Sequence, residues 1–266
     1  GLRSVVPVPT YSMYAVLTGQ RDAELVSVPR KGAEELYALD VEALIAALPG
    51  AGAVWLCVPN NPTGTPETRE DLLAILDAGA VLPHGGPAVV VDEAYIEFNG
   101  VSLVELRERY PALIVVRTLS KAFAMTGLRV GYCVAARKTI EQLERVRPPG
   151  SLNTLSAKAA ARALRQPEIA AANAQALCDE REWLGVRLAQ AGLPPTPSVT
   201  NFLLCRIGTP GEADELNETL LRGGIVVRTF GPDSPLAGHL RFTVRDREQN
   251  ERLLSIIEAW TAGRSA

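Results

Sequence analysis

The chain has few histidines, few cysteines and no long apolar run. Its two histidines, His84 and His239, lie far apart in 266 residues, so we expect no histidine-based metal site. Its four cysteines are widely spread without a CxxC pair, and three of them lie in apolar runs such as VWLCV, where cysteine usually acts as a small buried hydrophobe. This usage predicts reduced thiols and a cytoplasmic location.

The composition gives no reason to expect a membrane or nucleic-acid role. No apolar run approaches the roughly 20 residues that cross a bilayer, and residues 1–8 lack the layout of a signal peptide. The formal net charge of −3 provides no electrostatic attraction for nucleic acid or an acidic membrane. Hydrophobic residues make up 47% and charged residues 21%, as is ordinary for a soluble globular protein.

The first half of the chain predicts an α/β fold. Uniformly apolar, strand-like runs alternate with amphipathic stretches such as Val41–Leu48, which is the pattern of a mostly parallel sheet covered by helices. A second such stretch, Glu67–Ala78, follows Thr65-Pro66, so we expect Thr65 to cap a helix that has Pro66 as its first residue. The predicted strands are Ser4–Val8, Leu25–Pro29, Ala53–Val58, Ala88–Val91, Leu113–Val116 and Leu128–Ala135.

The second half predicts a smaller α+β domain. An Ala-rich helical run, Ser156–Arg165, precedes a long helical pattern, Pro167–Ala191, that ends at a glycine. We therefore expect a large domain over residues 1–165, a connecting helix over 166–191 and a small C-terminal domain over 192–266. The elements predicted for the small domain are the strands Phe202–Ile207, Ile225–Arg228 and His239–Val244 and the helices Gly211–Leu221 and Asp246–Thr261.

Polar residues follow three of the predicted strands. Asn61 lies in the segment NNPTG after VWLCV, Asp92 and Tyr95 lie in DEAY after AVVV, and Lys121 lies in TLSK after LIVVR. The intervals between these segments are each about one strand–helix–strand unit long. Because ligands bind at the carboxyl edge of open parallel sheets, we expect an amide, a carboxylate, a phenol and an amine to converge in one crevice.

A lysine beside a strand-end carboxylate has a specific chemical use. The amine of Lys121 can form a Schiff base with an aldehyde cofactor, and the carboxylate of Asp92 can pair with a protonated ring nitrogen. Thr118, Ser120 and Arg129 suit an anionic phosphate, because hydroxyls and a guanidinium donate hydrogen bonds to its oxygens. The pattern therefore favours a cofactor that carries both an aldehyde and a phosphate.

The segments PNNPTG, VVDEAY and RTLSKAFAMTGLRVG resemble the three motif segments of fold-type-I aminotransferases, which depend on pyridoxal 5'-phosphate. The resemblance is closest to the histidinol-phosphate aminotransferase branch and runs from Pro9-Thr10-Tyr11 to the C-terminal helix. It implies amino transfer between glutamate and an imidazole-bearing phospho-keto compound in histidine biosynthesis, by two ping-pong half-reactions. It also implies a homodimer.

The resemblance implies a role for each matching residue near the cofactor. Lys121 would hold the cofactor as an aldimine and move a proton between the substrate and the cofactor. Asp92 would keep the ring nitrogen protonated, and Asn61 and Tyr95 would hydrogen-bond the phenolic oxygen of the ring. Tyr11 would stack on the ring.

Two arginines are expected to bind the anionic groups of the substrate. Arg228 ends the run IVVR and Arg241 lies at the start of LRFTV, and two cations on neighbouring strand ends can clamp a carboxylate or a phosphate. In the branch that this chain resembles, the matching pair grips the substrate's phosphate, and one of the two also binds the carboxylate of glutamate. Asn201, at the start of NFLLC, matches an asparagine near the substrate.

The chain departs from the family in one respect. The family has a longer segment before PTY, which includes a glycine-rich helix start for the cofactor phosphate, so we expect the chain as written to bind cofactor weakly and to turn over poorly or not at all. Three alternatives stay open: a decarboxylase of phosphorylated amino acids such as threonine phosphate, an aromatic amino acid aminotransferase, and a truncated non-catalytic homologue.

Overall fold

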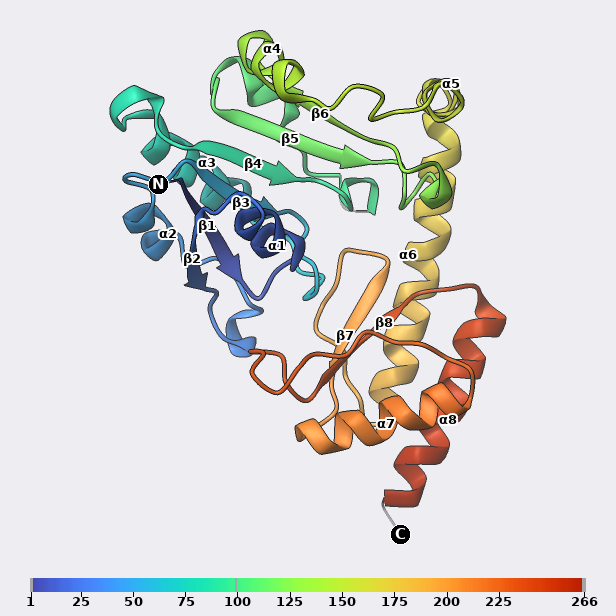
Figure 1. Ribbon diagram of the computed structural model, residues 1–266. Coiled ribbons are helices and arrows are strands. Elements are labelled where there is room, and N and C mark those ends of the chain that lie inside the picture. The colour runs from blue at the N-terminus through green and yellow to red at the C-terminus, as the bar shows by residue number, and fades with distance from the viewer. Residues whose placement is uncertain (1, 99, 265–266) are drawn as a thin grey trace.

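The computed structural model describes residues 2–98 and 100–264 and has a six-stranded sheet in its N-terminal part (Figure 1). The strand order is β2-β1-β3-β4-β5-β6, and neighbouring strands are parallel except for the antiparallel pair β5–β6. The predicted mostly parallel α/β sheet is therefore confirmed. Its strands are β1 (Arg3–Val8), β2 (Glu24–Pro29), β3 (Ala53–Cys57), β4 (Ala88–Asp92), β5 (Leu113–Thr118) and β6 (Gly131–Ala135).

Both faces of the sheet are buried over its central strands β1, β3, β4 and β5, which explains why these strands are mostly apolar. Successive side chains of a strand point to opposite faces. In β4, Val89 and Val91 pack against Leu72 and Ile75 of the helix that follows β3, while Val90 packs on the other face beside residues of the helix that follows β6. The helices of this part are α1 (Met13–Gly19), α2 (Val41–Ala47), α3 (Arg69–Ala80), α4 (Arg137–Val146) and α5 (Thr154–Ala163).

The long helix α6 (Pro167–Gln190) runs beside the sheet and into the C-terminal part (Figure 1). Near its start, Asn173 donates a hydrogen bond from Nδ2 to the carbonyl of Ala122 at 3.0 Å. Towards its end, Leu184 and Leu188 are fully buried in the core of the C-terminal part. The helix fills most of the predicted connecting segment, and the division into two domains at that segment stays a prediction.

The C-terminal part packs two helices and α6 around a small antiparallel sheet. The first of these helices begins with a capping box, in which Thr209 and Glu212 bind each other's backbone N–H groups. The elements are β7 (Phe202–Arg206), α7 (Pro210–Arg222), β8 (His239–Thr243) and α8 (Arg247–Arg264), with short 3₁₀ turns elsewhere at Ala33–Glu35, Pro83–Gly85, Ile96–Phe98, Val104–Glu108 and Thr126–Leu128. Within the described residues, no helix is both long and apolar enough to cross a membrane.

The predicted start of helix α3 is wrong. The helix begins at Arg69, and its cap is Thr68, whose side chain accepts a hydrogen bond from the N–H of Asp71 at 3.1 Å. The reason is a buried ion pair: Glu67 lies 2.5 Å from Arg30, and both side chains are almost fully shielded from solvent. This pair holds the chain around Glu67 outside the helix.

The predicted strand Ile225–Arg228 is also wrong. Only a single bridge forms there, between Arg228 and Arg241 of β8. Helix α7 ends just before, and Gly224 takes a left-handed conformation with φ of 74°, which turns the chain before a ladder can form. Strand β6 is confirmed but starts at Gly131 rather than Leu128, because a 3₁₀ turn and a left-handed Arg129 precede it.

Candidate active site

A cavity of about 950 Å³ lies where the carboxyl edge of the main sheet faces the segment before β8. The parallel register sets Cys57 beside Asp92 and Asp92 beside Val116, so the chain leaves β3, β4 and β5 at the same edge. All three predicted polar segments reach the cavity. The predicted site residues that line it are Tyr11, Asn61, Asp92, Tyr95, Thr118, Ser120, Lys121, Arg129, Arg228 and Arg241.

Asn201 is the predicted site residue that the structure places elsewhere. It precedes β7 and is not among the described residues that line the cavity. Its carbonyl accepts a hydrogen bond from the N–H of Val244 at 2.9 Å, which joins the start of β7 to the end of β8. Its position is therefore explained by the small sheet rather than by the cavity.

Asn60 holds the NNPTG segment against the PTY segment. It is fully buried, and its Nδ2 donates to the carbonyl of Pro9 at 3.2 Å and to Thr63 Oγ1 at 2.8 Å. Its Oδ1 accepts from Thr10 Oγ1 at 2.9 Å. These bonds fix the neighbouring residues Tyr11 and Asn61 at the cavity wall. The sequence does not distinguish Asn60 from Asn61, because their partners lie far away along the chain.

Asp92 lies at the end of β4 with both carboxylate oxygens bound. Oδ2 accepts a hydrogen bond from the hydroxyl of Tyr14 at 2.8 Å, and Oδ1 accepts from the N–H of Ala94 at 3.1 Å. Burial raises the pKa of Asp92, although these two bonds and the charge of Lys121 act against that rise. Tyr14 was not predicted as a site residue, and the motif positions alone gave no signal for it.

Lys121 follows β5 with its amine close to an aromatic ring. Its Nζ lies 5.1 Å from the centroid of the Tyr95 ring. Burial and the positive charge of Arg241 lower the pKa of Lys121, and together they outweigh the opposite effect of Asp92. The lowered pKa increases the share of neutral amine at neutral pH, and the neutral amine is the nucleophilic form.

Arg241 connects the C-terminal part to the NNPTG segment. Its Nη1 donates to Asn61 Oδ1 at 2.5 Å, and its guanidinium lies 4.6 Å from the centroid of the Phe202 ring. Because the oxygen of the Asn61 amide is taken, the NH₂ group of that amide is left to donate to a ligand. The backbone groups of Arg241 and Arg228 bind each other at 3.0 and 3.2 Å, which brings both arginines to one wall of the cavity.

The TLSK turn is held by its own side chains and those of the next turn. Thr118 Oγ1 accepts from the N–H of Ser120 at 3.1 Å and donates to the carbonyl of Val130 at 3.4 Å. Thr126 Oγ1 donates to the carbonyl of Ser120 at 2.8 Å, and Arg129 Nη1 donates to the carbonyl of Thr126 at 3.2 Å. Two hydroxyls and a guanidinium therefore lie together at this end of the cavity.

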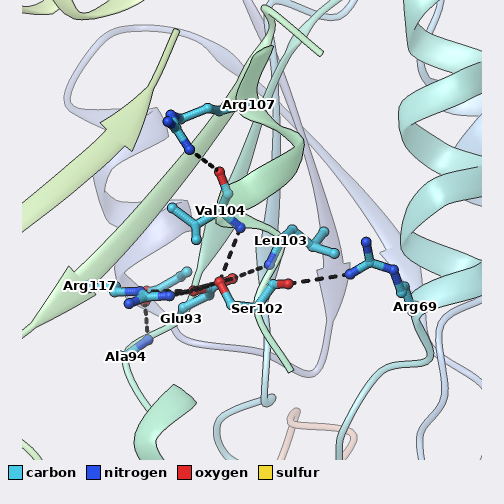
Figure 2. A network of polar contacts seen from close by, with 9 residues as sticks. Arg69, Glu93, Ala94, Ser102, Leu103, Val104, Arg107 and Arg117 are labelled. Carbon is cyan, nitrogen blue, oxygen red and sulfur yellow. Dashed lines mark hydrogen bonds and ion pairs between the residues drawn. The ribbon is translucent and has the colours of Figure 1, made fainter. Parts of the chain in front are cut away.

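The buried carboxylate of Glu93, the residue after Asp92, organises a polar network that the sequence did not reveal (Figure 2). It accepts hydrogen bonds from Arg117 Nε at 3.0 Å, Ser102 Oγ at 2.9 Å and the N–H of Leu103 at 2.8 Å. The network joins the ends of β4 and β5 to the loop around Ser102. It thereby fixes the backbone that carries Asp92.

The sequence profile of the family described as aminotransferase class I and II matches residues 1–257. Two similar curated proteins are histidinol-phosphate aminotransferases. The protein from Thermococcus gammatolerans is 35% identical over 265 residues, which cover 100% of this chain and 72% of the relative. The protein from Thermoanaerobacter pseudethanolicus is 37% identical over 252 residues, which cover 94% of this chain and 68% of the relative.

A solved structure has the same fold. The histidinol-phosphate aminotransferase of Sinorhizobium meliloti, solved in complex with pyridoxal-5'-phosphate, matches with a TM-score of 0.89 and 26% identity. The match covers 99% of this chain and 71% of that chain. The sheet, α6 and the small C-terminal part of this chain thus follow an arrangement already seen in that enzyme.

Proposed function

The chain belongs to the class I and II aminotransferase family and is a transferase, and from this premise we propose that it transfers an amino group between histidinol phosphate and 2-oxoglutarate. The proposed cofactor is pyridoxal phosphate. The observation that carries the proposal is the convergence, in one cavity, of Lys121, Asp92 and the two arginines Arg228 and Arg241. Support for the substrate comes from relatives that are 35% and 37% identical and carry that name.

The residues that line the cavity fit this cofactor. Lys121 offers an amine of lowered pKa, Asp92 offers a carboxylate, and the buried Nε of Arg241 has no hydrogen-bond partner among the described residues. When bound, pyridoxal phosphate supplies an electron sink for the bond that breaks at the substrate α-carbon. Lys121 Nζ would attach the cofactor and, once released, take a proton from that carbon and deliver it to the cofactor.

The remaining side chains would orient the two ligands. Asp92 would accept a hydrogen bond from the ring nitrogen, and the free NH₂ of Asn61 and the hydroxyl of Tyr95 would donate to the phenolic oxygen. Burial raises the pKa of Tyr95, so its hydroxyl stays a donor at neutral pH. Tyr11 would stack on the ring. The phosphate would lie at the turn of Thr118, Ser120 and Arg129.

The two arginines would bind the substrate. Arg228 and Arg241 line the same cavity as Lys121, and a guanidinium binds a phosphate or a carboxylate with two parallel hydrogen bonds. A phosphate on the amine substrate and the distal carboxylate of glutamate could then use the same wall in alternate half-reactions. This sharing is what a ping-pong exchange between the two substrates requires.

The test is the visible absorption of the purified chain with pyridoxal phosphate. We expect a band that depends on Lys121, that Lys121→Ala abolishes, and that Lys138→Ala leaves intact because Lys138 is exposed on α4. Glutamate or histidinol phosphate should bleach the band, and 2-oxoglutarate should restore it. An absorption band that neither glutamate nor histidinol phosphate bleaches would contradict the proposal. Release of carbon dioxide from threonine phosphate without a keto acid would contradict it as well.

A further inference from the structure

Tyr14 is a buried tyrosine of the site to which no role has yet been given. It lies on α1, is 3% exposed, and donates its hydroxyl to Asp92 Oδ2 at 2.8 Å. Its ring stacks on Trp55, with centroids 5.3 Å apart and 19° between the planes. It also meets the ring of Tyr11 edge-on at 5.6 Å. One side chain thus contacts both the carboxylate and the aromatic ring that face the cavity.

The charge of Asp92 depends on few groups. The titratable side chains that interact with it are Tyr14 from α1, Cys57 from the end of β3, Tyr95 just after β4, and Lys121 from the turn after β5. Burial raises the pKa of the Cys57 thiol to about 12, so this neighbour is neutral. The charge of Lys121 favours the ionised carboxylate of Asp92, whereas burial lowers the pKa of Lys121 itself. Among the described residues, Tyr14 is the side chain that donates a hydrogen bond directly to this carboxylate, at 2.8 Å.

Tyr14 is suited to act as a permanent donor. Burial raises its pKa well above the ordinary value for tyrosine, and the neighbouring Cys57 and Asp92 raise it further. The hydroxyl thus keeps its proton at every pH at which the protein would work. A neutral donor that cannot ionise stabilises the carboxylate without adding a charge of its own.

We propose that Tyr14 is a positioning residue that keeps Asp92 ionised and aimed at the ring nitrogen of the cofactor, and that it fixes the Tyr11 ring against the same cofactor. The identity of the group that Asp92 faces rests on the proposed function. The effect of Tyr14 on Asp92 does not rest on that function, because the hydrogen bond between them forms without any cofactor. The two claims can therefore be tested separately.

The first experiment needs no cofactor. The chain is labelled with ¹³C at aspartate carboxyl groups, Asp92 is assigned with Asp92→Asn, and its pKa is measured by NMR. We expect Tyr14→Phe, which keeps the ring and removes the donor, to raise the pKa of Asp92. The matched control is Tyr110→Phe, which removes a buried tyrosine hydroxyl bound to Asp77 at 2.6 Å outside the cavity and should leave Asp92 unchanged.

A second variant acts in the opposite direction and preserves the fold. Replacement of Tyr14 by 3-fluorotyrosine changes the size little but makes the hydroxyl a stronger donor, so the pKa of Asp92 should fall. This variant decides the question if Tyr14→Phe proves too unstable to titrate. The proposal is overturned if the pKa of Asp92 does not move in either variant, or if Tyr110→Phe moves it equally.

The second experiment measures pyridoxal phosphate binding by visible absorption at pH 7. We expect Tyr14→Phe to weaken binding about tenfold, the loss typical of one hydrogen bond to a buried charge, and Tyr110→Phe to have no effect. If the unaltered chain binds no pyridoxal phosphate, the proposed function fails while the titration still decides the role of Tyr14. Unchanged binding in Tyr14→Phe, beside binding by the unaltered chain, refutes the effect of Tyr14 on the cofactor.

Discussion

At the scale of single residues, the charge of Arg241 affects the protonation of Lys121 in the same cavity. Arg241 is held at the cavity by its bond to Asn61, and its charge, after burial, is the largest cause that lowers the pKa of the Lys121 amine. The same guanidinium is expected to bind the substrate. The residue that would select an anionic substrate therefore also prepares the lysine for reaction, which links binding to reactivity through a single charge.

We predict that Arg241→Gln raises the pKa of Lys121. Removal of the positive charge favours the protonated amine, so Lys121 stays charged up to a higher pH in the variant. The measurement is ¹³C NMR of the reductively methylated chain without cofactor, with Lys121→Arg for assignment. Arg228→Gln is the control, because Arg228 is not among the charges that shift Lys121. An unchanged Lys121 titration in Arg241→Gln would show that the charge of Arg241 does not contribute to the lowered pKa of Lys121.

Asp92, Asn61 and Lys121 could be predicted because each lies at the end of an apolar strand or within four residues after it. The residues that orient them could not be predicted, because their contacts join distant positions: Tyr14 binds a residue 78 positions away, and Asn60 binds Thr10 across 50 positions. A motif shows which side chains are present, but it does not show which hydrogen bonds orient them.

At the scale of elements, the start of α3 illustrates how tertiary structure overrides a local signal. Thr65-Pro66 has the composition of a helix start, but Glu67 is drawn into its ion pair with Arg30 and the helix begins later. A carboxylate that pairs with a buried guanidinium cannot also occupy the first turn of a surface helix. The local pattern was typical of a cap, and the buried charge decided the boundary.

We predict that Thr68→Ala lowers the free energy of unfolding by about 1 kcal/mol, because the N–H of Asp71 loses its acceptor. Urea unfolding followed by circular dichroism measures the change. Thr68→Ser keeps the acceptor oxygen and should stay within a few tenths of a kcal/mol of the unaltered chain. Equal losses in both variants would mean that the methyl group, rather than the cap, carries the effect.

At the scale of the whole molecule, the two sides of the cavity are joined by a small set of direct contacts. Arg241 binds Asn61, the N–H of Val199 donates to the carbonyl of Gly64 at 2.8 Å, and the hydroxyl of Tyr37 lies 3.3 Å from His239 Nε2. Two of these contacts involve the NNPTG segment. That segment therefore serves both as a wall of the site and as a junction with the C-terminal part.

We predict that Gly64→Ala weakens this junction. Gly64 has φ of 81°, and an added Cβ would lie 2.4 Å from Ser198 Oγ, so the variant combines backbone strain with a clash. We expect a loss of about 2–3 kcal/mol in the free energy of unfolding. Gly19→Ala is the control, because no atom lies within 4 Å of its added Cβ. Urea unfolding that gives equal stabilities for the two variants would contradict the prediction.

The sequence predicted the order of the elements and the overall architecture more reliably than it predicted where each element begins and ends. Apolar strands alternating with helices predicted the parallel sheet, and the match to solved enzymes agrees with it. The missing strand at Ile225–Arg228 could not be foreseen, because its apolar residues look like a strand while Gly224 turns the chain away from pairing. Whether the two parts fold separately stays a prediction.

The long helix α6 also has a mechanical consequence. Its 24 residues form a rod of about 36 Å. In its first half, Asn173 donates a hydrogen bond to the carbonyl of Ala122, the residue after Lys121. Its C-terminal end packs into the core that contains β8, the strand of Arg241. Because α6 contacts both parts, a tilt of one part along this rod would change the gap between the Lys121 amine and the Arg241 guanidinium, and with it the width of the cavity.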